Sequence, residues 1–128
     1  MTDLQAEAHA RQAAPRIGVC VNQATSDDAL TPLLWGMEEE GVPAAVERCP
    51  EIDPLALAQR AARSSRLGVG VGLSLGYAVV TTDKLPAQRL YLALAAGTPQ
   101  QIRTLGANAA RLVRRVPLKE VVVEGIAA

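Results

Sequence analysis

Apolar residues recur along the chain at two spacings, which predict strands and helices in alternation. An unbroken apolar run over residues 17–21, between Pro15 and Asn22, indicates a buried first strand. A stripe at helical spacing follows, formed by Leu30, Leu33, Leu34 and Met37. This stripe predicts a helix that begins near residues 25–28 and ends at Gly41.

Glycine alternates with apolar residues in the middle of the chain. A second strand over residues 44–48 and a second helix over residues 53–64 lead into this region. Over residues 67–73 the apolar side chains alternate with glycine at positions 68, 70 and 72, which is the two-residue period of a strand. One face of this strand has no side chains, so another element must pack directly on its backbone.

The second half of the chain predicts two further strands and the most clearly marked helix. Residues 77–82 are rich in β-branched residues and follow a tight turn, so they return antiparallel, and residues 90–94 form a fifth strand. Thr98 and Gln101 have the spacing of a capping box. The helix that they open keeps one apolar stripe until Pro117 ends it.

This order of elements indicates the α/β fold class. We expect a three-layer α/β/α sandwich on a mixed, mostly parallel sheet of about five strands. Residues 16–120 are expected to form a single domain. Residues 1–15 are predicted to be a flexible N-terminal tail, and residues 121–128 a C-terminal tail or edge strand.

The first predicted helix ends with charges of an unfavourable sign. A helix C-terminus is partially negative, so each exposed carboxylate there costs about 0.3 to 1 kcal/mol. On a helical wheel Glu39 lies opposite the apolar stripe, with Trp35 one turn earlier on the same outer face. Two interpretations remain open: a solvated acidic helix end, or a partner interface, because tryptophan is enriched at interface centres. The predicted interface consists of Trp35, Gly36, Glu38, Glu39 and Glu40.

The last predicted helix carries arginine on the side opposite its apolar stripe, at Arg103, Arg111, Arg114 and Arg115. Because no aromatic residues are interleaved with them, a solvated face is favoured over a phosphate-binding one. Gly106, inside this helix, costs about 1 kcal/mol relative to alanine. Close packing of a neighbouring element, or of a partner, would explain it.

Composition and charge exclude several classes of function. The chain has 128 residues, and its 13 basic and 13 acidic residues give a formal net charge of zero. It therefore has no global field that would concentrate nucleic acid or anionic membrane. No apolar run approaches the roughly 20 residues of a membrane span, and the first fifteen residues contain no hydrophobic core of a secretory signal. We expect a cytoplasmic protein that binds neither nucleic acid nor membrane.

The sequence lacks the motifs of nucleotide binding and nucleophilic catalysis. Its glycines give no G-x-G-x-x-G frame, and no G-x-x-x-x-G-K-[ST] loop occurs. The single histidine, His9, lies in the predicted tail, so the domain offers no base to a serine or cysteine nucleophile. We therefore predict no catalytic residues and no cofactor of the chain's own.

Two kinds of metal site stay open on the sequence. Cys20 lies in a predicted strand and Cys49 just after another, without C-x-x-C spacing. Buried free thiols are the favoured interpretation, with a disulfide or a metal site as the alternative. A surface glutamate can also supply one oxygen to a hard cation whose other ligands come from another chain.

Three segments of the chain, taken together, resemble one protein family. They are residues 34–43, which contain Trp-Gly-Met-Glu-Glu-Glu-Gly, the glycine-alternating residues 61–74, and residues 101–109, with Lys-Leu-Pro at residues 84–86 between them. In this order and approximate spacing they resemble the small subunit of diol or glycerol dehydratase reactivase. The resemblance covers about residues 16–118.

The resemblance implies a chaperone-like accessory protein that is not itself an enzyme. In that family the small subunit is similar in fold to the dehydratase β subunit and pairs with a large subunit of actin-like ATPase fold, as an α2β2 complex that binds ATP or ADP on the large subunit. The complex releases damaged cobalamin from inactivated adenosylcobalamin-dependent diol or glycerol dehydratase by subunit exchange. The resemblance further implies that Glu39, rather than Glu38, is a ligand of Mg2+ at the subunit interface, and that the protein is bacterial and cytoplasmic, with microcompartment association left open.

Two other functions also stay open on the sequence. The chain is short for a structural, medium-subunit-like component of a B12-dependent dehydratase, which is the first alternative. The second is a stand-alone α/β binding module that forms a homodimer through the Trp35 face.

Overall fold

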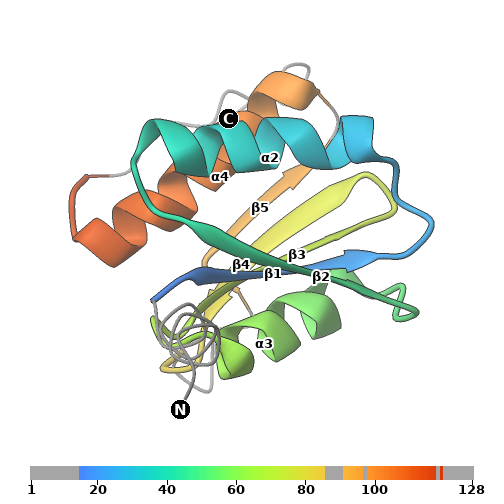
Figure 1. Ribbon diagram of the computed structural model, residues 1–128, viewed down its shortest axis with the longest axis horizontal. Helices are drawn as coiled ribbons and strands as arrows, with labels where there is room; N and C mark the ends of the chain where they lie inside the picture. The colour runs from blue at the N-terminus through green and yellow to red at the C-terminus, as the bar shows by residue number, and fades with distance from the viewer. Residues whose placement is uncertain (1–14, 86–90, 97, 118, 120–128) are drawn as a thin grey trace, which may run out of the picture.

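A five-stranded sheet with helices on both faces organises the computed structural model of the chain (Figure 1). The structure describes residues 15–85, 91–96, 98–117 and 119. The strands are β1 (Ile17–Asn22), β2 (Ala44–Cys49), β3 (Val69–Ser74), β4 (Tyr77–Thr82) and β5 (Ala93–Ala96). The helices are α2 (Asp27–Glu39), α3 (Pro54–Ser64) and α4 (Pro99–Arg114).

The sheet combines parallel and antiparallel pairings in the order β2-β1-β3-β4-β5. Strand β1 pairs parallel with β2 and β3, whereas β4 pairs antiparallel with β3 and β5. Helices α2 and α4 cover one face and α3 covers the other (Figure 1). The predicted α/β sandwich on a mixed sheet is confirmed, although the two kinds of pairing are equally represented because the β3–β4 hairpin and β5 add two antiparallel neighbours.

The predicted elements occur with small shifts at their ends. Strand β2 runs one residue further than predicted, to Cys49, and β5 begins at Ala93 rather than at residue 90. Helix α4 ends at Arg114, because Arg115 takes the left-handed conformation with φ of 57°. The predicted tails, residues 1–15 and 121–128, lie outside the described residues except for Pro15.

The N-terminus of α4 has the predicted capping box. The Thr98 hydroxyl accepts a hydrogen bond from the Gln101 backbone N–H at 3.2 Å. The Gln101 side-chain oxygen in turn accepts from the Thr98 backbone N–H at 3.3 Å. Two backbone donors that helix geometry leaves without a partner are thereby satisfied.

The glycine face of the sheet lets α3 pack at backbone distance. A Cβ atom on Gly70 would lie 2.1 Å from the backbone nitrogen of Ala62, and one on Gly72 would lie 2.0 Å from the carbonyl oxygen of Pro54. A Cβ on Gly18 of β1 would meet α3 at 2.3 Å. These contacts confirm the prediction that another element packs directly on the glycine-rich strand, and they identify that element as α3.

The other face of the sheet carries the main apolar core. It consists of aliphatic side chains, in keeping with the scarcity of aromatic residues. Its buried members include Ile17, Val19, Val21, Val71, Leu73 and Val80 of the strands, Leu30, Leu33 and Met37 of α2, and Ile102 and Leu105 of α4. Burial of these side chains fixes α2 and α4 on the same face.

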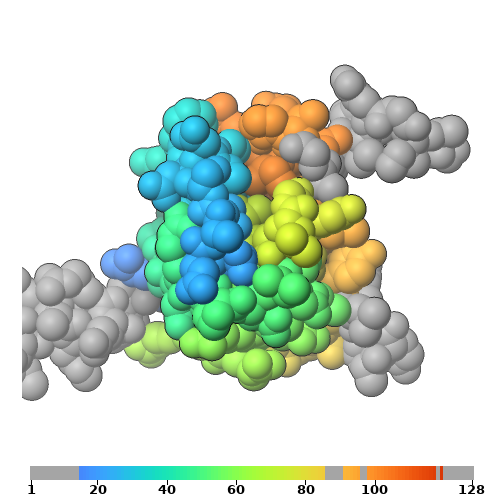
Figure 2. Space-filling view, turned by 90° about the vertical axis from the view of Figure 1, so that its right-hand side faces the viewer, coloured from blue at the N-terminus to red at the C-terminus, as the bar shows by residue number. Residues whose placement is uncertain are grey.

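The carboxyl ends of the parallel strands meet at one edge of the sheet, which faces the viewer in Figure 2. The loop after β1 and the segment before α3 lie side by side there, and the Asn22 side chain donates to the carbonyl oxygen of Glu51 at 2.9 Å. The turn between β3 and β4 lies beside them (Figure 2). Open α/β sheets bind small ligands at this edge. The acidic end of α2 lies at the opposite edge of the sheet, where β2 begins.

Replacing Gly72 with alanine should destabilise the chain by about 3 kcal/mol, because the added methyl group would overlap the carbonyl oxygen of Pro54 and displace α3. Gly76→Ala is the control. Gly76 has φ of 79° and no atom within 4 Å of an added Cβ, so its cost is limited to a backbone term of roughly 1 kcal/mol. Urea unfolding measures both losses, and equal losses would contradict direct packing of α3 on β3.

Candidate functional site

Helix α2 begins with charges of the favourable sign. The Ser26 hydroxyl caps it by accepting from the Ala29 backbone N–H at 3.2 Å. Asp27 and Asp28 occupy the first turn, where carboxylates complement the helix dipole. No basic residue occupies the last turn, so compensation for the acidic C-terminus has to come from another element.

Helices α2 and α4 touch through two glycines. A Cβ atom on Gly36 would lie 2.0 Å from the carbonyl oxygen of Arg103, and one on Gly106 would lie 2.2 Å from the carbonyl oxygen of Leu33. Gly106 is thus explained by close packing of a neighbouring element, which was one of the two predicted explanations. The outward placement predicted for Gly36 is wrong, because α2 buries a second face against α4 beside the apolar stripe that faces the sheet.

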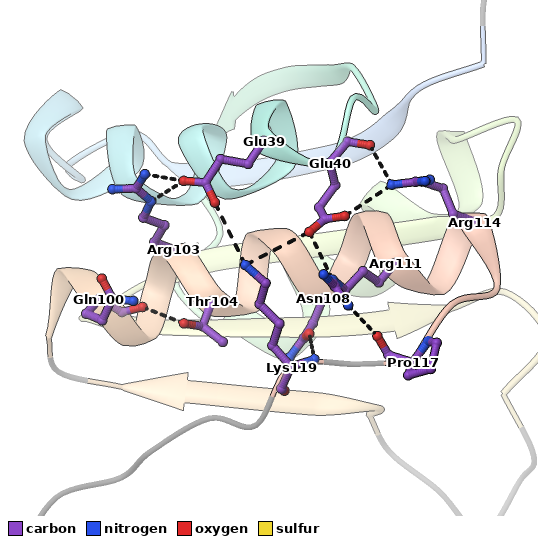
Figure 3. A network of polar contacts seen from close by, with 10 residues as sticks. All are labelled: Glu39, Glu40, Gln100, Arg103, Thr104, Asn108, Arg111, Arg114, Pro117 and Lys119. Atoms are coloured by element: carbon purple, nitrogen blue, oxygen red, sulfur yellow. Dashed lines mark hydrogen bonds and ion pairs between the residues drawn. The ribbon is translucent and has the colours of Figure 1, made fainter.

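Arginines of α4 neutralise the acidic end of α2 (Figure 3). Arg103 forms an ion pair with Glu39. Arg111 Nε and Arg114 Nη1 lie 2.9 Å and 3.1 Å from the two carboxylate oxygens of Glu40. Three of the four arginines predicted to form a solvated face are therefore ion-paired with α2, and the unfavourable charge at its C-terminus is offset.

Lys119 brings a further positive charge to the same place. Its ammonium nitrogen lies 4.0 Å from carboxylate oxygens of both Glu39 and Glu40 (Figure 3). The Asn108 side chain fixes the Lys119 backbone by donating to its carbonyl oxygen at 2.9 Å and accepting from its N–H at 2.6 Å. The segment after α4 is thereby tied to the helix pair.

Adjacent glutamates at the end of α2 occupy different environments. The Glu40 side chain is 10% exposed, between Arg111 and Arg114, whereas the Glu39 side chain is 35% exposed. Glu38 lies at the surface. The predicted interface therefore needs a second correction, since Glu40 is largely covered by the chain's own arginines.

The exposed part of the predicted interface centres on Trp35. The residue is 52% exposed, as the helical wheel predicts. The guanidinium carbon of Arg103 lies 5.7 Å from the centre of its ring, a distance typical of a cation–π contact. Trp35, Glu38, Glu39 and Arg103 line a surface pocket of about 430 Å³. These side chains offer a partner an aromatic face, an arginine and two carboxylates.

Glu39 presents a carboxylate at the surface, next to two cationic side chains. A carboxylate oxygen is a ligand that Mg2+ prefers, and Glu39 reaches the surface. In the described part of the chain, no group of three cysteine, histidine or carboxylate ligands surrounds it. Arg103 and Lys119 are its cationic neighbours. The described residues therefore do not by themselves form a three-ligand site for Mg2+ at Glu39.

Sequence reasoning missed the cationic half of this site, namely Arg103, Arg111, Arg114 and Lys119. A signal for it was present: each of the two helices carries an interior glycine, Gly36 or Gly106, and the charges near these glycines are of opposite sign. Glycines of this kind allow close backbone approach. Together they indicate that the two helices pair.

Comparison with known proteins finds one family over most of the chain. The family model for the dehydratase medium subunit matches residues 14–119. The chain is 46% identical over 96 residues to the probable glycerol dehydratase-reactivating factor small subunit of Citrobacter freundii, which covers 72% of this chain and 81% of that protein. It is 35% identical over 108 residues to the diol dehydratase-reactivating factor small subunit of Klebsiella michiganensis. This match covers 84% of this chain and 86% of that protein.

Solved structures agree with these sequence matches. A glycerol dehydratase reactivase structure superposes with a TM-score of 0.77 at 37% identity, covering 85% of this chain and all of the matched chain. A structure of a diol dehydratase-reactivating factor complexed with ADP and Mg2+ gives a TM-score of 0.76 at 35% identity. The superposition covers 84% of this chain and 99% of the matched chain. The likeness extends over all of the first matched chain and nearly all of the second.

Glu40→Gln should destabilise the isolated chain by about 2 kcal/mol, because two arginines would lose their carboxylate in a largely covered site. Glu39→Gln should change stability by no more than about 0.5 kcal/mol, since exposed ion pairs contribute little. From the helix dipole alone, Glu39→Gln is expected to leave stability almost unchanged or to raise it slightly, and the ion pair with Arg103 opposes such a gain. Thermal and urea unfolding compare the two variants, and similar losses would refute the distinction.

Proposed function

The chain belongs to the dehydratase medium-subunit family, among the small subunits of diol and glycerol dehydratase-reactivating factors, and we propose that it works as the partner of a large ATPase subunit. It is an accessory component with a chaperone-like role. The finer proposal is that it pairs with an actin-like large subunit in an α2β2 complex, and that nucleotide binds to the large subunit. A related factor has been solved with ADP and Mg2+.

The client that we propose is an inactivated adenosylcobalamin-dependent diol or glycerol dehydratase. The names of the relatives support this class of client. The match to the dehydratase medium-subunit family supports exchange as the mechanism, because a chain that shares the fold of a dehydratase subunit can take that subunit's place. Such an exchange would open the enzyme and let damaged cobalamin leave.

The contact with the large subunit is proposed at the end of α2. The observation that carries it is the exposure of Trp35 beside Glu39, in a position where the chain's own core does not cover either side chain. Arg103 contacts both side chains and keeps them together. Arg111 and Arg114 hold Glu40 apart from them. The interface therefore consists of Trp35, Glu38 and Glu39, with Arg103 added.

We also propose that Glu39 holds Mg2+ jointly with carboxylates of the large subunit. The ion would supply positive charge that joins acidic groups of the two chains. The Glu39 carboxylate would then bind the ion and Arg103 at the same time, or it would leave Arg103 to bind the ion. Its limited burial leaves room for such a change, whereas Glu40 is fixed from two sides.

The place of action that we propose is the bacterial cytoplasm. Among the described residues, no helix combines the length and the apolar character that crossing a bilayer requires.

Glu39→Gln should weaken assembly with the large subunit, because a hard cation site loses affinity with each carboxylate removed. We expect at least about a tenfold loss in Mg2+ and a smaller difference in the presence of a chelator. Glu38→Gln is the matched control on the neighbouring exposed residue and should have less effect. Assembly is measured by calorimetry, alongside reactivation of inactivated dehydratase.

Three outcomes of this experiment separate the proposals. Unchanged assembly and reactivation by Glu39→Gln would remove Glu39 from the interface. Failure of the wild-type chain to pair with any large subunit would remove the ATPase partnership. Co-purification of the chain as a permanent part of the dehydratase would favour the structural, medium-subunit-like role.

The purified chain should show no ATP binding in the micromolar range by isothermal titration calorimetry. The physical reason is that its sequence offers no glycine-rich phosphate loop. The large subunit alone should bind ATP under the same conditions. Tight ATP binding by the small chain would contradict the assignment of nucleotide to its partner.

A further inference from the structure

Two buried cysteines and a glutamate meet on the α3 face of the sheet, opposite the face that α2 and α4 cover. Cys20 of β1 lies beside Glu47 of β2 in the parallel register, and Cys49 follows two residues later on the same face. The sulfur atoms of both cysteines and a carboxylate oxygen of Glu47 all lie within 4.8 Å of one another. Neither cysteine is in a disulfide, as the sequence predicted.

The cluster is closed on one side and open on the other. Cys20 and Cys49 are each 2% exposed and pack with Leu57 and Ala61 of α3. The Glu47 side chain is 52% exposed, so the carboxylate connects the buried sulfur atoms to the surface. A route from solvent to a buried donor set is one requirement of a metal site.

Arg60 of α3 supports the carboxylate of this cluster. Its Nη2 atom lies 2.6 Å from Oε1 of Glu47. Residues that orient a ligating side chain in this way are typical of metal sites. The guanidinium also balances part of the negative charge that two thiolates and a carboxylate would bring together.

The separations fit a tetrahedral ion. Bonds of about 2.3 Å to sulfur and about 2.0 to 2.2 Å to oxygen place ligand atoms on one zinc ion roughly 3.5 to 3.8 Å apart. The three donor atoms lie within 4.8 Å of one another, so side-chain rotation would have to bring them from at most that separation to this spacing. Sulfur donors favour Zn2+ and related soft ions over Mg2+.

We propose that Cys20, Cys49 and Glu47 bind one zinc-type divalent ion, with solvent in the fourth position. The ion would join the edge strand β2 to β1. This site does not depend on the proposed function, since it lies on the other face of the sheet from Glu39 and takes a different class of metal.

The surroundings of Cys20 disfavour its thiolate form. Burial, followed by the effect of the neighbouring Cys49, raises the pKa of the Cys20 thiol to about 12. Glu47 also raises it and Arg60 opposes the shift. The Cys20 thiol of the ion-free chain therefore keeps its proton at neutral pH.

The test uses the full chain in a phosphine reductant, with Co2+ as a spectroscopic probe and Zn2+ as its competitor. We expect one Co2+ per chain, a thiolate-to-cobalt charge-transfer band, displacement by Zn2+ and none by Mg2+. Cys20→Ser and Cys49→Ser should each abolish the band. Glu47→Gln, a surface change, should keep the band and lower affinity by about tenfold or more, whereas Glu51→Gln, on the same segment, should leave affinity unchanged.

Three results would overturn the proposal. The first is absence of Co2+ and Zn2+ binding at micromolar concentrations by the reduced chain. The second is binding that persists when both cysteines are replaced by serine, which would place the ion elsewhere. The third is an unchanged charge-transfer band in Cys20→Ser or Cys49→Ser, which would remove that cysteine from the ligand set.

Discussion

The direct contact between α2 and α4 is the constraint on which the candidate site depends. At Gly36 and Gly106 no side chain separates the two helices. Helices with ordinary side chains at the crossing pack about 8 to 10 Å apart, and alanine at either glycine would overlap the facing backbone. The close approach brings arginines of α4 within reach of the acidic end of α2. Each glycine costs about 1 kcal/mol of helix stability relative to alanine, and the contact offsets that cost.

This contact divides the acidic helix end into two parts. Glu40 lies in the angle between the helices and meets two arginines there, so it belongs to the structure of the domain. Glu39, one residue earlier, lies nearer the rim, beside Trp35 and Arg103. A run of like charges thus combines a residue that stabilises the fold with one that remains available to a partner. Burial decides between the two roles, since both residues have the same chemistry.

Most of the fold follows from local patterns in the sequence. Alternation of glycine over residues 67–73 was enough to predict that an element packs directly on β3, because a strand face without side chains leaves no other arrangement. The exposure of Trp35 followed from helical periodicity. The burial of Gly36 did not follow from helical periodicity, because a helical wheel assumes one buried face and α2 has two buried faces. The interior glycines and the opposite charges near them indicate that α2 and α4 pair, but which arginine meets which glutamate follows only from the placement of α4, more than sixty residues later, beside α2.

The two layers that cover the sheet contact it in different ways. Helix α3 rests on the backbone at Gly18, Gly70 and Gly72, so few side chains lie between them whose rotamers could adjust. Helices α2 and α4 pack against valine, leucine and isoleucine side chains of the sheet. Helices packed through side chains can slide slightly relative to their neighbours, a movement known as shear. Their own contact, however, is again backbone to backbone. A partner that displaces α2 at Trp35 would therefore also displace α4, because no side chain lies between the two helices at Gly36 and Gly106 to absorb the movement.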